Sequence, residues 1–548
     1  MNNKFLLSVI VPAVFSIGVI QAAPKTVPRP KLVVGVVVDQ MRWDYLYRYY
    51  DRYTAGGFKR LLGKGFSCEQ TYINYLPSYT APGHTCVYSG TVPSVHGIAS
   101  NDWIDQRTGK TVYCTDDKTV QPVGGSQKAG QMSPANMYVS TITDELRLAT
   151  NFAGKTVGVA IKDRGAILPA GHTANAAYWF DDSTGNFISS TFYMQQLPAW
   201  AQAFNQSGTA QSLMNKQWDL LYDKATYTMS TGDENGYEGR YKGEANVSFP
   251  HNVAGKTSRS FDLLRKLPWG NALTLAFAQA ALDGYALGQD DVTDMLCVSL
   301  SSTDYIGHQF GINAMEVEDT YLRLDQDLAG FLTYLDKKVG KGNYLLMLTA
   351  DHGGAHNPAY MTDNRLPAGY WFNQDKKKEL DAYLEKQTGK RGLVRDIAYY
   401  YVHLDDSAIV ASGLEVAAIR KLTRAFLLEQ PEVQYAIDMS EADQAPMPDA
   451  LKKMLPNGYS RERSGAVHLV LKPGYYEAYA RTGTTHGSWN PYDTHIPLLW
   501  YGWKVPHGSS VHKTDMTDIA ATIAAMLRIQ VPNGCIGTPV PELMVPLK

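Results

Sequence analysis

Short runs of valine, isoleucine and leucine recur along the chain, and their spacing constrains the fold more than any other feature. The runs cover residues 31–38, 155–162, 294–301, 343–349 and 497–502. Continuous apolar runs of this length are typical of strands buried on both faces of a parallel sheet. Patterns with helical spacing lie between them, at residues 44–62, 272–287, 317–339 and 516–527. The alternation predicts an α/β protein with a doubly wound, mostly parallel sheet.

Two long stretches rich in Tyr, Gly, Asn and Pro interrupt this alternation, and we interpret them as insertions into the core. The chain has 548 residues, which is enough to bury a large core. The predicted organisation is a signal segment at 1–22, core parts at 23–170, 286–359 and 481–548, and insertions at 171–285 and 360–480.

The first residues have the pattern of a secretory signal peptide. Lys4 precedes an apolar run over residues 5–20, and small residues follow it. Pro24 disfavours a cut directly before it, so we expect cleavage after Ala22 and a periplasmic or secreted mature protein. An uncleaved membrane anchor is the alternative, although Pro12 interrupts a run that is near the lower length limit for spanning.

Charge and cysteine content exclude several classes of function. Lys and Arg number 51 against 53 Asp and Glu, a net charge of −2, so the chain has no general attraction to nucleic acid or anionic membranes. We expect no nucleic-acid-binding surface, no stable membrane anchor after cleavage, and a monomer. The cysteines contain no CxxC pair, which argues against a cysteine zinc site, and they allow at most two disulfides. They are Cys68, Cys86, Cys114, Cys297 and Cys535.

Acidic and histidine residues cluster at the ends of the predicted strands. The six are Asp39, Asp304, His308, Asp351, His352 and His486. Ligands bind at the carboxyl ends of the strands in open α/β sheets, so we expect these side chains to converge at one edge. Carboxylate oxygens and imidazole nitrogens suit zinc, with manganese as the alternative. Their number is right for two metal ions with three protein ligands each and open positions for substrate and water.

Each of these residues also has an ordinary structural explanation. An Asp after a strand is usually a turn residue or a helix N-cap, and Asp304 and His308, four residues apart, could simply pair on one helix face. The set is more specific than its members, because nearly all fall at the same end of different strands. His356 and His495 are rival ligands, and we expect neither to bind metal directly.

Thr80 is the candidate nucleophile. It precedes a renewed helical pattern, and a helix N-terminus favours an oxyanion or a phosphate. A threonine hydroxyl is a weak nucleophile until a base or a metal activates it, which a metal held by Asp39, Asp351 and His352 would do. The alternative is that Thr80 or Ser78 merely caps the helix.

Together these motifs resemble the alkaline phosphatase superfamily. The matching segments are Asp39, Thr80-Ala81-Pro82-Gly83-His84, His96-Gly97, Asp304 with His308, Ala350-Asp351-His352-Gly353 and Thr485-His486-Gly487. The mature chain looks most like the secreted bacterial phosphate-irrepressible alkaline phosphatases with a threonine nucleophile, the flavobacterial type. The resemblance implies two zinc ions per chain. One would be bound by Asp304, His308 and His486, and the other by Asp39, Asp351, His352 and the Thr80 oxygen.

A few sequence positions distinguish this chain from two related groups of enzymes. Sulfatases have Cys or Ser followed four residues on by Arg, whereas here His84 follows Thr80, which excludes formylglycine chemistry. Nucleotide pyrophosphatase/phosphodiesterases share the threonine and the six ligands but lack a pair like Lys162 and Arg164. In the monoesterase branch such a pair, with an Asn matching Asn101, contacts the phosphoryl oxygens. The alternative is that Lys162 and Arg164 form a solvated strand end.

Charge favours a phosphate monoester as the small-molecule substrate. The formal charges of the site sum to +2, which a dianion neutralises. The sum includes two zinc ions, three Asp carboxylates, a Thr80 alkoxide, Lys162 and Arg164. A diester would leave a cation uncompensated in a partly desolvated site, which is costly. The resemblance implies in-line attack by Thr80 and hydrolysis of the resulting phosphothreonine. A phosphodiesterase is the second prediction, and a non-catalytic, metal-stabilised binding protein, such as a secreted glycan binder, is the third.

Overall fold

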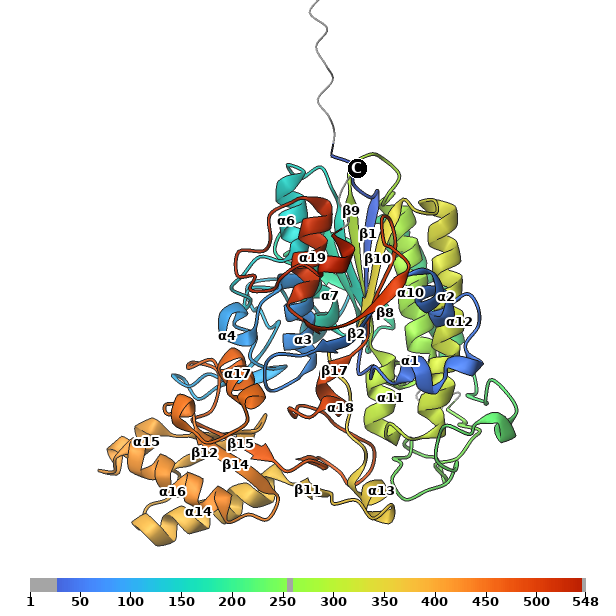
Figure 1. Cartoon of the computed structure of the whole chain (residues 1–548). Helices are drawn as coiled ribbons and strands as arrows, with labels where there is room; N and C mark the ends of the chain where they lie inside the picture. The colour runs from blue at the N-terminus through green and yellow to red at the C-terminus, as the bar shows by residue number, and fades with distance from the viewer. Residues whose placement is uncertain (1–26, 254–259, 545–548) are drawn as a thin grey trace, which may run out of the picture.

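A central sheet organises the molecule (Figure 1). The computed structural model describes residues 27–253 and 260–544, so the predicted signal peptide lies outside the described residues. Five neighbouring strands run parallel, in the order β10 (Tyr344–Thr349), β1 (Leu32–Val38), β9 (Asp294–Leu300), β6 (Thr156–Ala160) and β7 (Ala176–Asp181). All seven residues of β1 are buried, as expected for a strand covered on both faces.

Further strands extend the sheet on both sides. They are β8 (Asn186–Ser190) and β5 (Pro122–Val123) beyond β7, and β18 (Leu498–Gly502), β2 (Phe66–Tyr72), β17 (His495–Ile496) and β19 (Gly508–Asp515) beyond β10. The prediction that residues 497–502 form a parallel strand is wrong, because β18 runs antiparallel to β10, with Leu499 opposite Leu348. An antiparallel strand begins at the edge where its parallel neighbours end. The loop that precedes β18 therefore lies at the carboxyl edge of the parallel strands.

Helices cover both faces of the sheet, which confirms the predicted doubly wound α/β fold (Figure 1). One face carries α10 (Trp269–Gly284), α12 (Met315–Lys338) and α2 (Phe58–Lys64), and the other carries α3 (Thr80–Ser89), α6 (Ile142–Ala149), α7 (Asp163–Ala170) and α19 (Asp518–Leu527). The helices predicted at 272–287, 317–339 and 516–527 match α10, α12 and α19 to within a few residues.

The predicted helix at 44–62 is instead broken. It consists of α1 (Tyr45–Arg48), a 3-10 turn (Tyr50–Arg52) and α2. The carboxylate of Asp325 accepts hydrogen bonds from the backbone N–H groups of Thr54 and Phe58. These bonds hold the chain in a turn, and α2 begins only after it. A tertiary contact thus overrides the local helical pattern.

A second, smaller sheet lies apart from the first and appears at the lower left of Figure 1. Its antiparallel strands run in the order β12 (Val394–Ala398), β13 (Tyr401–Leu404), β15 (Val467–Leu471) and β14 (Val433–Asp438), with helices α14 (Asn373–Thr388), α15 (Asp406–Ala411), α16 (Val416–Leu428) and α17 (Asp449–Gly458) around them. All of these elements fall within the predicted insertion 360–480. By contrast, β7, β8 and α10 fall within the predicted insertion 171–285 but belong to the central sheet and its helical layer. The domain limits remain predictions.

The remaining elements are short or connect the two sheets. They are α4 (Pro93–His96), α5 (Gln127–Gly130), α8 (Ala199–Gln206), α9 (Thr209–Met214), α11 (Ser302–Phe310), α13 (Pro358–Asp363), α18 (Pro491–Thr494), β3 (Asp102–Ile104), β4 (Thr111–Tyr113), β11 (Gly369–Trp371) and β16 (Tyr475–Glu477). Within the described residues no helix is long and apolar enough to cross a bilayer. All five cysteines are free thiols, so neither of the two disulfides that the sequence allowed is formed.

Candidate active site

Four neighbouring strands end at one edge of the central sheet, and a charged residue follows each of them. In the order β10, β1, β9 and β6 these residues are Asp351, Asp39, Asp304 and Lys162. Because the strands are parallel and adjacent, side chains that are far apart in the sequence meet at this edge.

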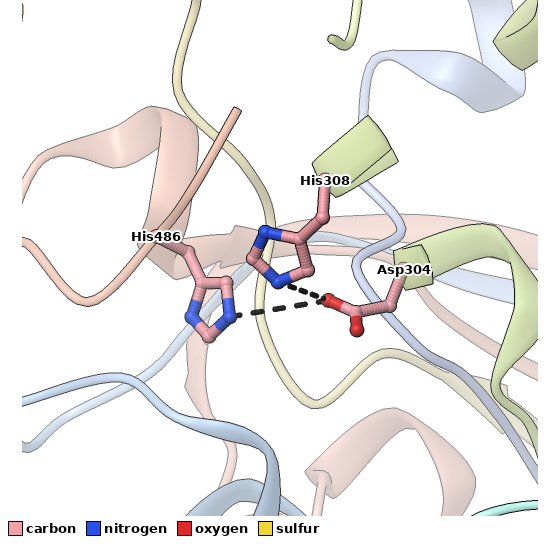
Figure 2. Close-up of side chains that lie close together, drawn as sticks. All are labelled: Asp304, His308 and His486. Atoms are coloured by element: carbon pink, nitrogen blue, oxygen red, sulfur yellow. Dashed lines mark ion pairs between the residues drawn. The ribbon is translucent and has the colours of Figure 1, made fainter. Parts of the chain in front are cut away.

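The first candidate metal-binding group comprises Asp304, His308 and His486 (Figure 2). Helix α11 begins just after β9 and places residues 304 and 308 on one face, with His308 Nε2 3.1 Å from Asp304 Oδ1. His486 reaches the same carboxylate oxygen from the loop before β18, at 3.9 Å. The side chain of His308 is 36% exposed and those of the other two are 4% exposed, so this group opens to solvent.

The second group comprises Asp39, Asp351 and His352, and all three side chains are fully buried. The Nε2 atom of His352 lies 3.5 Å from an oxygen of each carboxylate. The rings of His352 and His486 stack with their centroids 3.4 Å apart, so the two groups are direct neighbours. Such adjacent groups could hold a pair of metal ions.

The three histidines are oriented alike. Each hydrogen-bonds through Nδ1 to a backbone carbonyl, His308 to that of Thr484 at 2.8 Å, His352 to that of Gly353 at 2.9 Å and His486 to that of Ser78 at 2.7 Å. A carbonyl only accepts, so each Nδ1 carries the proton and each Nε2 presents a lone pair to the group. Metal-binding histidines in proteins are held in this way.

Electrostatics at the sheet edge also fit a bound cation. Burial, together with the nearby Asp304 and Asp351 charges, raises the pKa of Asp39 well above its usual range. Burial lowers the pKa of His486 well below its usual value, and neighbouring histidines add to the effect. Among the described residues, Asp39 Oδ1 and Asp351 Oδ2 are buried without a hydrogen-bond partner. At His308 burial opposes protonation, but the adjacent Asp304 carboxylate outweighs it and raises the pKa, so a metal ion would have to displace a proton there. Imidazole nitrogens and carboxylate oxygens without hydrogen-bond partners are a suitable donor set for a divalent metal ion.

Thr80 is the first residue of α3 and lies beside the second group. Its Oγ1 is 3.4 Å from His352 Nε2. The N-cap position belongs to Tyr79, whose side chain makes no capping bond, and the hydroxyl of Ser78 donates to the carbonyl of Ser488. Neither Thr80 nor Ser78 is therefore a conventional cap of this helix.

Lys162 is buried, with 1% of its side chain exposed. Its Nζ atom lies 2.6 Å from Asp39 Oδ2 and 2.6 Å from Asp304 Oδ2, one carboxylate from each group. This position does not fit the alternative of a solvated strand end. An ammonium group has three donors, so one N–H remains for a ligand in the crevice.

Arg164 is close enough to Lys162 for their charges to interact, and Asn101 contacts the residue after Thr80. The Nη1 of Arg164 donates to the Tyr113 hydroxyl at 3.0 Å, and its Nε is buried without a hydrogen-bond partner. No carboxylate in residues 27–253 or 260–544 is within ion-pair distance of this guanidinium. The Asn101 carbonyl oxygen accepts from the N–H of Ala81, beside Thr80, which leaves the amide NH₂ as the group that can donate to a ligand.

The two rival histidines lie outside both groups. His356 contacts Asn313 Oδ1 at 2.7 Å through Nδ1. His495 contacts the carbonyl of Glu69 at 2.8 Å through Nε2 and stacks against Trp43. Both rings are therefore engaged by residues other than the six candidate ligands.

Sequence reasoning assigned no role to three residues that touch the site. His84 lies 2.9 Å from the Thr80 carbonyl and 3.3 Å from Asp351 Oδ2, and its helical spacing from Thr80 could have revealed it. Gln40 follows Asp39 and hydrogen-bonds to carboxylates of both groups. Nothing in the sequence marks Tyr113, because its contact with Arg164 depends on how β4 packs.

A doubly wound sheet with two adjacent candidate metal-binding groups and a hydroxyl at a helix N-terminus is an arrangement suited to a metal-dependent hydrolase. The family described as type I phosphodiesterase / nucleotide pyrophosphatase matches residues 33–493, and the chain belongs to this family. The resemblance predicted from the motifs is therefore confirmed at the level of the superfamily.

Individual relatives cover nearly the whole chain. The sequence is 50% identical to a protein of Myroides odoratus named calcium-transporting ATPase, and 48% identical to alkaline phosphatase PafA of Elizabethkingia meningoseptica, and each comparison covers 99% of both chains. The crystal structure of PafA matches with a TM-score of 0.93 at 48% identity, over 95% of this chain and 100% of that one. The predicted resemblance to bacterial alkaline phosphatases is thus confirmed by a relative of that name over nearly the whole chain.

Proposed function

We propose that this chain is a periplasmic or secreted, zinc-dependent alkaline phosphatase that hydrolyses phosphate monoesters through a covalent intermediate on Thr80. Full-length similarity to PafA, which is named an alkaline phosphatase, supports hydrolysis of phosphate monoesters by this chain. The single observation that favours a monoester over a diester is the environment of Arg164.

Arg164 is a half-buried cation that makes no ion pair among the described side chains, and its Nε is buried without a hydrogen bond. The charges of Asp163 and Asp102 act on it without direct contact, so its guanidinium keeps donors for an anionic ligand. Arg164 and Lys162 together match the two negative charges of a monoester, whereas a diester brings only one. A guanidinium can also bind two phosphoryl oxygens at once.

The two groups at the sheet edge would hold the metal ions. Asp304, His308 and His486 would bind one zinc ion, and Asp39, Asp351, His352 and the Thr80 oxygen would bind the other. Bound zinc supplies Lewis acidity, which polarises phosphoryl oxygens and lowers the pKa of a coordinated hydroxyl.

The reaction follows from where the chain places its own groups. The hydroxyl of Thr80 loses its proton, and its oxygen attacks phosphorus. The bond to the leaving oxygen breaks, that oxygen takes up a proton, and a phosphothreonine forms. Arg164, Lys162 and the NH₂ of Asn101 neutralise and orient the phosphoryl oxygens. The alcohol leaves on the side of His308, because that side chain is the exposed one of the six. Water then releases phosphate and restores the hydroxyl.

The test compares an aryl phosphate monoester with its methyl diester, using the mature chain loaded with zinc. We expect kcat/KM to favour the monoester strongly, and an acid quench followed by peptide mass spectrometry to find phosphate on Thr80. A preference for the diester would overturn the phosphatase in favour of a phosphodiesterase. Zinc binding without turnover of either ester would support the binding protein instead. ATP belongs in the same assay, because its terminal phosphoryl group is also a dianion.

A further inference from the structure

Gln40 contacts both metal-binding groups. Its backbone N–H donates to Asp351 Oδ1 at 3.1 Å, and its side-chain Nε2 donates to Asp304 Oδ1 at 2.8 Å. Asp351 belongs to the second group and Asp304 to the first. One buried residue, 3% exposed, therefore spans the two groups without being a ligand of either.

The backbone of Gln40 adopts a conformation that glutamine rarely takes. Its φ is +63°, in the left-handed region, at the end of β1. A residue with a side chain is rare in this conformation and persists only where the surroundings enforce it. At this position the enforced conformation permits the bonds to the two carboxylates.

Neighbouring residues leave space for the amide. A Cβ atom at Gly307 would lie 1.9 Å from Gln40 Oε1, and one at Gly354 would lie 3.3 Å from Gln40 Cδ. Gly307 immediately precedes the ligand His308, and Gly354 follows His352 by two residues. The amide is thus wedged between the two segments that supply these histidines.

The Asp304 carboxylate is fixed at both oxygens. Lys162 contacts Oδ2, and Gln40 donates to Oδ1, the oxygen that faces His308. A primary amide can donate here without changing the net charge of the site. Met at this position would keep the length of the side chain but remove the donor, and Glu would place an acceptor against another carboxylate.

We propose that Gln40 is a positioning residue that fixes the Asp304 carboxylate relative to the second group. The first group then binds its metal tightly only when the bond from Gln40 Nε2 to Asp304 Oδ1 is made. This inference rests on the proposed function, since it assumes that both groups bind zinc. It assigns to Gln40 the role of setting the relative affinity of the two groups, in addition to any effect on the reaction.

The test is zinc occupancy of Gln40→Met and Gln40→Glu across a series of zinc buffers, measured by elemental analysis. We expect one of the two zinc ions to need about 10–100-fold more free zinc for half-occupancy, the usual effect of losing a bond to a metal ligand. The other ion should keep the wild-type midpoint. Gln217→Met, at an exposed glutamine, is the matched control and should change neither midpoint.

Loss of both ions in parallel, or of neither, in variants with the wild-type circular dichroism would overturn the role of Gln40. If Gln40→Met fails to fold, Gln40→Glu provides the measurement, because Glu has nearly the same shape as Gln and preserves the packing of the side chain. Measurements on the wild-type chain distinguish a failure of the inference about Gln40 from a failure of the proposed function. If it binds two zinc ions and hydrolyses monoesters while Gln40→Met behaves identically, only the inference about Gln40 is wrong. If it binds none, both proposals are wrong.

Discussion

At the scale of single residues, the hydroxyl of Thr80 lies where a nucleophile is needed, at the start of α3 and 3.4 Å from His352. We expect Thr80→Ala to reduce kcat for a monoester by about 10³-fold or more, because removal of a nucleophile eliminates the covalent route. Thr80→Ser should retain measurable turnover and the phosphorylated intermediate. Near-wild-type turnover of Thr80→Ala, measured at equal zinc content, would contradict the covalent mechanism.

Lys162 and Arg164 supply the positive charge that we assign to recognition of a dianion. In the double variant Lys162→Ala with Arg164→Ala, kcat/KM for monoesters should fall more than kcat/KM for diesters, because a diester has one charge fewer to compensate. Steady-state kinetics on an aryl monoester and its methyl diester give the two ratios. Equal losses on both esters would refute the charge argument.

Elements as well as residues determine the site, and the loop before β18 is the clearest case. Gly483 has a φ of +73°, and a Cβ atom there would lie 1.9 Å from the backbone oxygen of the candidate ligand His308. Gly413 has almost the same φ, +74°, but open space around it. Alanine substitutions at the two glycines therefore distinguish the free-energy cost of the left-handed backbone conformation from the cost of the close contact with His308.

Alanine at these glycines should have different effects on the metal site. Gly413→Ala should lower stability by about 1–2 kcal/mol, the cost of a left-handed conformation, and leave zinc binding unchanged. Gly483→Ala should in addition displace α11 or the loop and weaken zinc binding at the first group. Thermal melting and zinc-buffer titration of both variants provide the comparison. Identical zinc midpoints for the two would show that the contact with His308 has no influence on the site.

At the scale of the whole molecule, an ion-pair cluster joins the segment before residue 254 to the start of α12. His251 is buried, with Nδ1 3.1 Å from Glu244 and Nε2 2.9 Å from Glu316. Burial opposes protonation, but the two carboxylates outweigh it and raise the pKa of His251 to about 9. Nearby, burial and Glu316 raise the pKa of Glu238 to about 9 as well.

These shifts predict that the protein loses stability at alkaline pH. The folded pKa of His251 lies above that of an unfolded histidine, so its contribution is complete below about pH 6.5 and is lost as pH rises through about 9. The loss amounts to about 3 kcal/mol. Glu238 acts in the same direction, because between about pH 4.5 and about pH 9 it ionises in the unfolded chain but not in the folded one.

Urea unfolding at pH 6 and pH 10 tests the contribution of His251. We expect the difference between the two pH values to be smaller in His251→Gln than in the wild type. His512→Gln is the matched control, because His512 also pairs with a glutamate, Glu542, but is 82% exposed. An equal pH difference in His251→Gln and the wild type would show that His251 does not contribute.

The sequence by itself determined the class of the fold and the six candidate ligands. Apolar runs identify buried strands locally, because such strands need apolar side chains on both faces. The rule that parallel strands share one carboxyl edge then brings Asp39, Asp304 and Asp351 together without any knowledge of packing. The helix predicted at 44–62 failed for the opposite reason, since Asp325 in a distant helix decides where that segment turns.

Only the tertiary structure decided the direction of β18 and the contacts that complete the site. A strand's pattern of side chains is the same whichever way it runs, so the sequence does not show that β18 is antiparallel and that His486 therefore reaches the edge from the loop before it. The ion pairs of Lys162, the bond from Arg164 to Tyr113 and the bridge formed by Gln40 join residues from separate elements. Such pairings depend on how the elements pack, because no local pattern in the chain specifies which distant side chain will fill a given space.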